Sequence, residues 1–145
     1  DTGEKVLVIL DDCISDIRGK GKGEIENLLH RMFFNRRHLA GKGGSMSIMA
    51  TSQTYNKIDP KLRKTASHLA FFENKNKKEL DTIFDEAILI PKREFYDTLR
   101  YIFDRPFQFM YTTLPDYKMI HKNFNQLEVK SPNIMGESYF ENAEV

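Results

Sequence analysis

Two adjacent carboxylates, Asp11 and Asp12, are the residues whose type and position point most directly to chemistry. They follow the apolar run Val6–Leu10, in which three of the five residues are β-branched. Such a run is typical of a strand buried on both faces of a parallel sheet, and open α/β sheets bind ligands at the carboxyl ends of their strands. This is the form of a Walker B element, in which one acid helps to hold the magnesium ion of a bound nucleoside triphosphate and its neighbour can polarise the attacking water. A core strand that ends in a polar turn has the same pattern.

Gln53 is a second polar side chain at the end of an expected strand, which covers residues 45–52. If the two strands are neighbours, Gln53 lies beside the two acids. Because an amide both donates and accepts hydrogen bonds, it could orient the lytic water or sense the γ-phosphate. The alternative is a strand-end amide that caps a turn.

Three arginines could act on a phosphate. Arg36 and Arg37 end the amphipathic helix expected over 24–38, where the helix dipole favours cations in any case. Either could instead reach a neighbouring subunit's γ-phosphate as an arginine finger. Arg63, in the segment Asp59-Pro60-Lys61-Leu62-Arg63, is a similar candidate. Each of the three also fits an ordinary surface residue.

A phosphate cradle of the form G-x-x-x-x-G-K-[ST] does not occur in these 145 residues. Two stretches, 18–23 and 41–45, contain Gly and Lys but lack this spacing and follow the acidic strand. We therefore expect the sequence to be the carboxyl-terminal part of a larger ATPase, inactive alone.

Charge and composition bound the function classes. The chain is 40% hydrophobic and 30% charged, and no apolar run is long enough to span a membrane. The single Cys13 excludes an internal disulfide, and the four scattered His residues show no zinc-binding spacing. Residues 18–64 carry eleven Lys/Arg against three acids, a local charge of +8 that could meet phosphate groups of nucleic acid or nucleotide.

The elements that must position these residues alternate between strands and helices. The periodicity predicts strands at 6–10, 45–52, 68–72 and 107–113 and helices at 24–38, 61–65, 77–87 and from Pro91 to about 103. This order predicts an α/β fold with a three-layer, mostly parallel sheet like that of P-loop NTPases, present as a partial domain. We expect residues 1–113 to form this ATPase part and 114–145 to be a weakly structured tail or docking arm.

Taken in order, these segments resemble the FtsK–HerA superfamily of DNA-pumping ATPases. The resemblance is carried by the acidic strand ending in Asp11-Asp12, by Arg37-His38, by Ser52-Gln53 and by the segment Pro60 to Arg63, and it covers about Val6 to Phe72. It is closest to the poxvirus-like DNA-packaging ATPases of large DNA viruses, virophages and related mobile elements.

The resemblance implies a P-loop motor that binds ATP and Mg²⁺ and works as a homo-oligomeric ring on double-stranded DNA. Asp11 then matches the magnesium acid, Asp12 the catalytic acid, Gln53 the sensor and Arg37 the finger, with Arg36 and Arg63 as second choices. Many P-loop motors have Glu where this chain has Asp12, and the Gly-containing turn at 42–44 lengthens the segment after the arginine.

The resemblance further implies capsid or portal-vertex proteins as partners, no membrane, and a location in the host cytoplasm or viral factory or with the virion. The DNA-contacting residues would be Arg18, Lys20 and Lys22, in a basic Gly-containing loop that tracks phosphates; an ordinary mobile loop has the same composition. Two other functions fit the sequence: a non-catalytic, P-loop-derived interaction module, and a different P-loop helicase or coupling ATPase.

Overall fold

The computed structural model describes residues 3–14, 23–114, 116–129 and 140–142. The chain divides into two compact units, Asp1–Thr65 and Ala66–Val145. The first contains a small parallel sheet and the second an antiparallel one, so the fold is mixed α/β. No helix in the described ranges is both long enough and apolar enough to cross a membrane.

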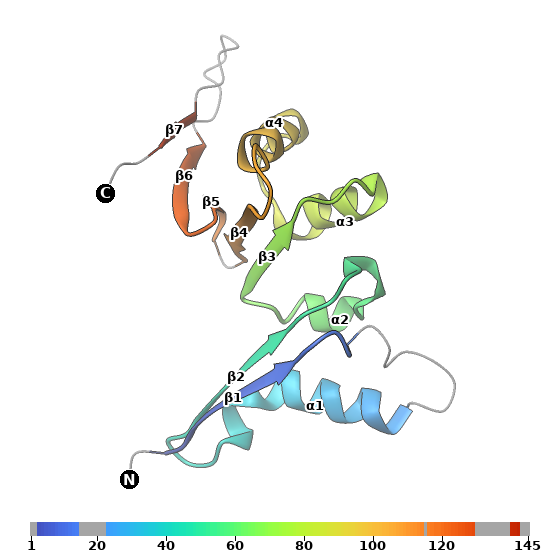
Figure 1. Ribbon diagram of the computed structural model, residues 1–145. Coiled ribbons are helices and arrows are strands. Elements are labelled where there is room, and N and C mark those ends of the chain that lie inside the picture. The colour runs from blue at the N-terminus through green and yellow to red at the C-terminus, as the bar shows by residue number, and fades with distance from the viewer. Residues whose placement is uncertain (1–2, 15–22, 115, 130–139, 143–145) are drawn as a thin grey trace. The chain divides into compact units, whose positions relative to one another are not determined.

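The first unit is built on two parallel strands joined through a helix. Strands β1 (Lys5–Leu10) and β2 (Ser45–Ala50) pair over their whole length, from Lys5 opposite Ser45 to Leu10 opposite Ala50. Parallel neighbours need a crossover connection, which here contains α1 (Gly23–Leu39). Figure 1 shows the two strands side by side with α1 alongside them.

Glycines end the crossover and bring the chain back to β1. Gly41 has φ +76°, the left-handed conformation that commonly stops a helix. A Cβ at Gly44 would collide with the backbone of Ala40, so only glycine fits where β2 begins. Ser45 N then donates to Glu4 O at 3.0 Å, which starts the strand pairing.

In the described residues, the first strand is covered on one face, whereas the sequence predicted burial on both faces. Val6, Val8 and Leu10 are partly buried, whereas Leu7 and Ile9 are each 61% exposed. The physical reason is that the sheet of this unit has two strands and one helix, α1, which packs against β2 with Leu29 buried.

Two short helices close the first unit after β2. They are η1 (Tyr55–Lys57) and α2 (Pro60–Arg63). Asp59 is the N-cap of α2 and its carboxylate accepts a hydrogen bond from Lys61 N at 2.7 Å, while Pro60 occupies the first helical position, where its missing N–H costs nothing.

The second unit is a five-stranded antiparallel sheet with two helices. Its strands, in spatial and sequence order, are β3 (His68–Phe72), β4 (Phe109–Thr113), β5 (Asp116–Lys122), β6 (Asn125–Val129) and β7 (Phe140–Asn142). Helices α3 (Lys77–Ala87) and α4 (Lys92–Ile102) connect β3 to β4.

Alternate positions of these strands separate a core from an open face. Phe95 and Ile102 of α4 are fully buried with Met110 of β4 and Ile120 of β5. On the opposite side of the sheet, Phe72 is 62% exposed and Phe109 stands beside it with a ring separation of 5.8 Å.

In the second unit, the antiparallel sheet corrects the prediction that the strands at 68–72 and 107–113 belong to a mostly parallel sheet. Two consecutive helices, rather than one, separate β3 from β4, and β4 runs antiparallel to β3. The segment from Leu114 onward was predicted to be weakly structured, but β5 and β6 form a hairpin there, with Lys122 opposite Asn125. The proposed boundary at 113 therefore falls inside this sheet, and the division between units lies at Thr65.

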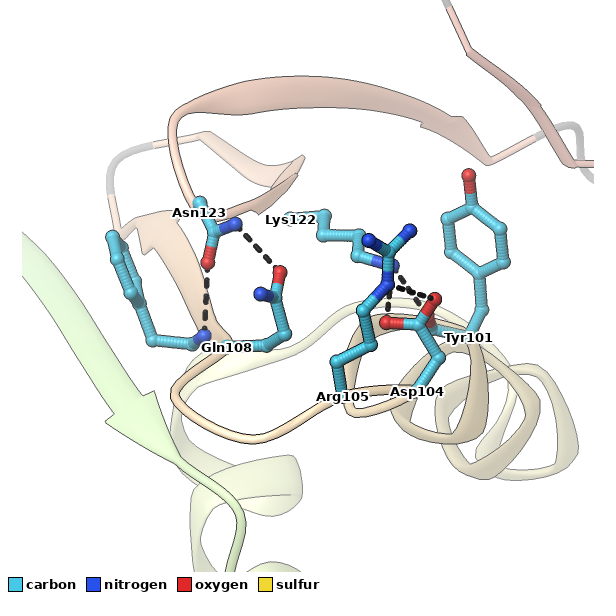
Figure 2. A network of polar contacts seen from close by, with 7 residues as sticks. Tyr101, Asp104, Arg105, Gln108, Lys122 and Asn123 are labelled. Carbon is cyan, nitrogen blue, oxygen red and sulfur yellow. Dashed lines mark hydrogen bonds and ion pairs between the residues drawn. The ribbon is translucent and has the colours of Figure 1, made fainter.

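A polar network joins the end of α4 to β5 (Figure 2). Lys122 Nζ donates to Asp104 Oδ1 at 2.7 Å and to Tyr101 O at 3.0 Å. The hydrogen bond from Lys122 to Asp104 holds the pKa of the Asp104 carboxyl below its usual value. At the adjoining turn, Asn123 has φ 55° and its side chain contacts both Gln108 and the Phe109 backbone.

Candidate functional site

The carboxyl ends of β1 and β2 bring together the polar residues that the sequence singled out. The strand pairing continues one step past the strands, since Thr51 N donates to Leu10 O at 2.9 Å. Asp11 and Asp12 therefore leave β1 directly beside the Thr51–Gln53 segment that leaves β2. Parallel strands end at the same edge of a sheet, which is why this prediction followed from the sequence.

Asp11 and Thr51 form the first link of the site. Thr51 Oγ1 donates to Asp11 Oδ1 at 2.6 Å and accepts from Asp12 N at 2.9 Å. The Thr51 hydroxyl thus positions both the carboxylate of Asp11, the candidate magnesium ligand, and the backbone of Asp12. The contact uses one carboxylate oxygen of Asp11.

Asp12 and Gln53 form the second link. Gln53 Nε2 donates to Asp12 Oδ2 at 2.6 Å. Asp12 also has φ 47°, a left-handed conformation that Asp and Asn adopt more readily than other non-glycine residues. This turn of the backbone sends consecutive carboxylates to different partners, Asp11 to Thr51 and Asp12 to Gln53.

The carboxylate oxygens at the ends of β1 and β2 are of the kind that hard cations such as Mg²⁺ prefer as ligands. Both carboxylates are exposed, and the donors that contact them in the described residues, a hydroxyl and an amide, are neutral. Mg²⁺ typically takes one or two carboxylates and completes its shell with water and phosphate oxygens. The arrangement could therefore bind Mg²⁺ through Asp11 while Asp12 and Gln53 face the water next to it.

Two of the three predicted arginines are engaged inside their own unit. The guanidinium of Arg36 donates to the carbonyls of Phe33 and Thr65, both at 3.4 Å. Arg63 donates to Tyr55 O at 3.1 Å and lies over the Tyr55 ring, with its central carbon 4.8 Å from the ring centroid. These contacts assign both arginines a role in holding the segments after β2.

The other predicted residues are placed less fully. Arg37 lies in α1, but its side chain is not among those that the structure describes. Arg18, Lys20 and Lys22, the predicted DNA contacts, lie outside the described residues.

Sequence reasoning did not assign a role to Thr51, which contacts both acids. The available signal was its register: it is the first residue after β2, opposite the first residue after β1. A hydroxyl at that position of a parallel pair can reach the neighbouring strand end.

The chain was compared with protein-family models, with curated proteins and with solved structures, and no match was found in any of the three comparisons.

Proposed function

We propose that the unit Asp1–Thr65 carries the magnesium and water-activating half of an ATP-hydrolysis site, in a motor that moves double-stranded DNA. The observation that carries the proposal is the pair of hydrogen bonds across parallel strand ends, Thr51 to Asp11 and Gln53 to Asp12. In a P-loop ATPase the same two strand ends supply the magnesium acid, the catalytic acid and a sensor amide.

Each residue then has a separate task. Asp11 helps to hold Mg²⁺, whose charge neutralises the β- and γ-phosphates of ATP. Asp12 polarises the attacking water, and Gln53 holds that carboxylate in position and orients the water through its own carbonyl oxygen.

The β1–α1–β2 unit belongs, in this proposal, to a three-layer parallel sheet. The exposed apolar side chains of Leu7, Ile9 and Met49 support this assignment, because such a sheet would cover that face with further chain. The phosphate cradle must come from outside these 145 residues, since the sequence has no G-x-x-x-x-G-K-[ST] segment. Arg37 would complete the site of a neighbouring subunit, and Arg18, Lys20 and Lys22 would contact DNA phosphates.

The decisive experiment is nucleotide hydrolysis by the complete gene product carrying Asp12→Asn. Asn keeps the size of the side chain and tolerates the left-handed backbone, but it cannot act as a base. We expect turnover stimulated by double-stranded DNA to fall by about 100-fold or more while binding of Mg²⁺–ATP persists.

The matched control is Asp85→Asn, the same chemical change at an exposed position of α3. It should leave turnover unchanged. Full turnover in Asp12→Asn would remove Asp12 from catalysis and favour a non-catalytic interaction module. Stimulation by single-stranded DNA alone would favour a helicase or coupling ATPase.

A further inference from the structure

A group of three potential metal ligands lies in the first unit, apart from the strand-end acids. It consists of Glu26 and His30 of α1 and Asp59, the N-cap residue of α2. Among the described residues, these are the three His, Cys, Asp or Glu side chains that lie close enough together to hold one metal ion. Glu26 and His30 are four residues apart and therefore share one face of the helix. A nitrogen or oxygen of each side chain lies within 4.8 Å of the others.

The imidazole of His30 has one ring nitrogen, Nε2, without a hydrogen-bond partner. The side chains of His30 and Asp59 are only 19% and 12% exposed. His30 Nε2 is shielded from solvent and has no hydrogen-bond partner, and it lies 3.7 Å from Asp59 Oδ2, beyond hydrogen-bond range. A buried polar atom left in this state normally has a ligand, an ion or water to satisfy it.

The spacing of these atoms suits two ligands of one metal ion. At bond lengths of about 2.0–2.1 Å, two ligand atoms on a tetrahedral zinc ion lie about 3.4 Å apart, close to the distance between His30 Nε2 and Asp59 Oδ2. Neighbouring groups also position both side chains. Asp59 Oδ1 accepts from Lys61 N, and the Phe34 ring stands edge-on to the imidazole with a centroid separation of 6.0 Å.

We propose that Glu26, His30 and Asp59 bind a divalent transition-metal ion, with zinc as the reference ion. One imidazole with two carboxylates favours such an ion over Mg²⁺ or Ca²⁺, which prefer oxygen ligands alone. Three protein ligands leave a position for water. The bound ion would fasten α1 to the start of α2, and this binding does not depend on the function proposed for Asp11 and Asp12.

The sequence alone did not predict this group because only two of its three residues are close together along the chain. Glu-x-x-x-His on a helix is a common spacing, and Asp59 is distant along the chain. The absence of Cys neighbours led to the expectation of no zinc site, which considered local clusters rather than residues brought together by the fold.

The test is a zinc titration of the metal-free full chain in competition with a chromophoric chelator, with Co²⁺ absorption as a second readout. We expect the wild type to bind a single Zn²⁺ and to melt at a higher temperature when zinc is present. His30→Ala and the isosteric Glu26→Gln should each lower zinc affinity by about 10-fold to 100-fold or more. Co²⁺ bound to the wild type should show ligand-field bands that the His30 variant loses.

Two control variants locate the site. His38→Ala removes an exposed imidazole from the same helix, and Asp11→Asn alters the strand-end acids; both should bind zinc as the wild type does. Circular dichroism of Glu26→Gln establishes that weaker binding does not come from unfolding. Equal zinc binding by His30→Ala and the wild type would overturn the proposal. The proposal would also be overturned if the wild type bound no zinc. If His30→Ala then melted at a lower temperature than the wild type, His30 and Asp59 would form an ion pair without metal.

Discussion

At the scale of single residues, the two side chains that donate hydrogen bonds to the strand-end acids in the described part of the chain are both neutral. Thr51 and Gln53 each donate to one oxygen of a different carboxylate, so these hydrogen bonds orient the acids without adding positive charge. This suits a site whose positive charge is to come from Mg²⁺. A salt bridge to either acid would compete with the metal for the same oxygens.

We expect Thr51 and Asp11 to be energetically coupled. Thr51→Val removes the hydroxyl that donates to Asp11 and accepts from Asp12 N, whereas Asp11→Asn weakens the same bond from its other end. A double-mutant cycle on the free energy of unfolding, measured by urea denaturation, should give a coupling of about 0.5–1 kcal/mol, because the bond is exposed. Strictly additive effects would show that this hydrogen bond does not persist in solution.

The sequence could predict which strand-end residues meet, but not how the longer side chains are used. Asp11, Asp12 and Gln53 converge because two parallel strands end at one edge, which hydrophobic periodicity reveals. The partners of Arg36 and Arg63 are backbone carbonyls placed by the turn after β2, and no pattern of residue types encodes those distances. For the same reason, the sequence did not predict that Asp59 lies close to His30.

At the scale of elements, most helices and strands were predictable, whereas the direction of the strands in the second unit was not. Helix α3 was predicted with its observed bounds, because its apolar residues recur with helical spacing. The hairpin of β5 and β6 was missed, since its turn residues, Asn123 and Phe124, lack the Asn-Gly or Asp-Gly signal of tight hairpins. Without that hairpin, alternating strands and helices suggested a parallel sheet.

The contact between α4 and β5 should make the second unit acid-sensitive through Asp104 (Figure 2). Lys122 lowers the pKa of Asp104 in the folded state, chiefly by a hydrogen bond. A lowered pKa contributes stability above the ordinary carboxyl value, and that contribution is lost as the pH falls through the native value. Lys122→Met keeps the apolar stem, so its free energy of unfolding should fall less steeply than that of the wild type between about pH 5 and pH 2.

The check is a series of urea denaturations over this pH range, together with an NMR titration of the Asp104 carboxyl. Its pKa should rise in Lys122→Met. Lys75→Met, at an exposed loop position, is the matched control and should retain the wild-type slope. Parallel pH profiles for Lys122→Met and the wild type would mean that the ion pair is not maintained in solution.

At the scale of the whole molecule, the two units have different relations to the proposed activity. Asp1–Thr65 contains the two strand-end acids, the candidate sensor Gln53 and all three candidate finger arginines. Ala66–Val145 has its own core, centred on Phe95, Ile102, Met110 and Ile120, and none of the predicted site residues. The catalytic proposal therefore depends on the first unit and on how its copies are arranged in an assembly.

A motor that shares its active sites between subunits makes one further prediction, on Arg37. Because Arg36 and Arg63 already bind carbonyls of their own unit, Arg37 remains the first choice for a finger acting on a neighbour. Assemblies of the complete gene product made only of Arg37→Ala subunits, or only of Asp12→Asn subunits, should not hydrolyse ATP. Random equal mixtures of the two should recover turnover, since about one interface in four pairs an intact Asp12 with an intact Arg37. The measurement is steady-state hydrolysis against mixing ratio; no recovery at any ratio would mean that Arg37 acts within its own subunit or not at all.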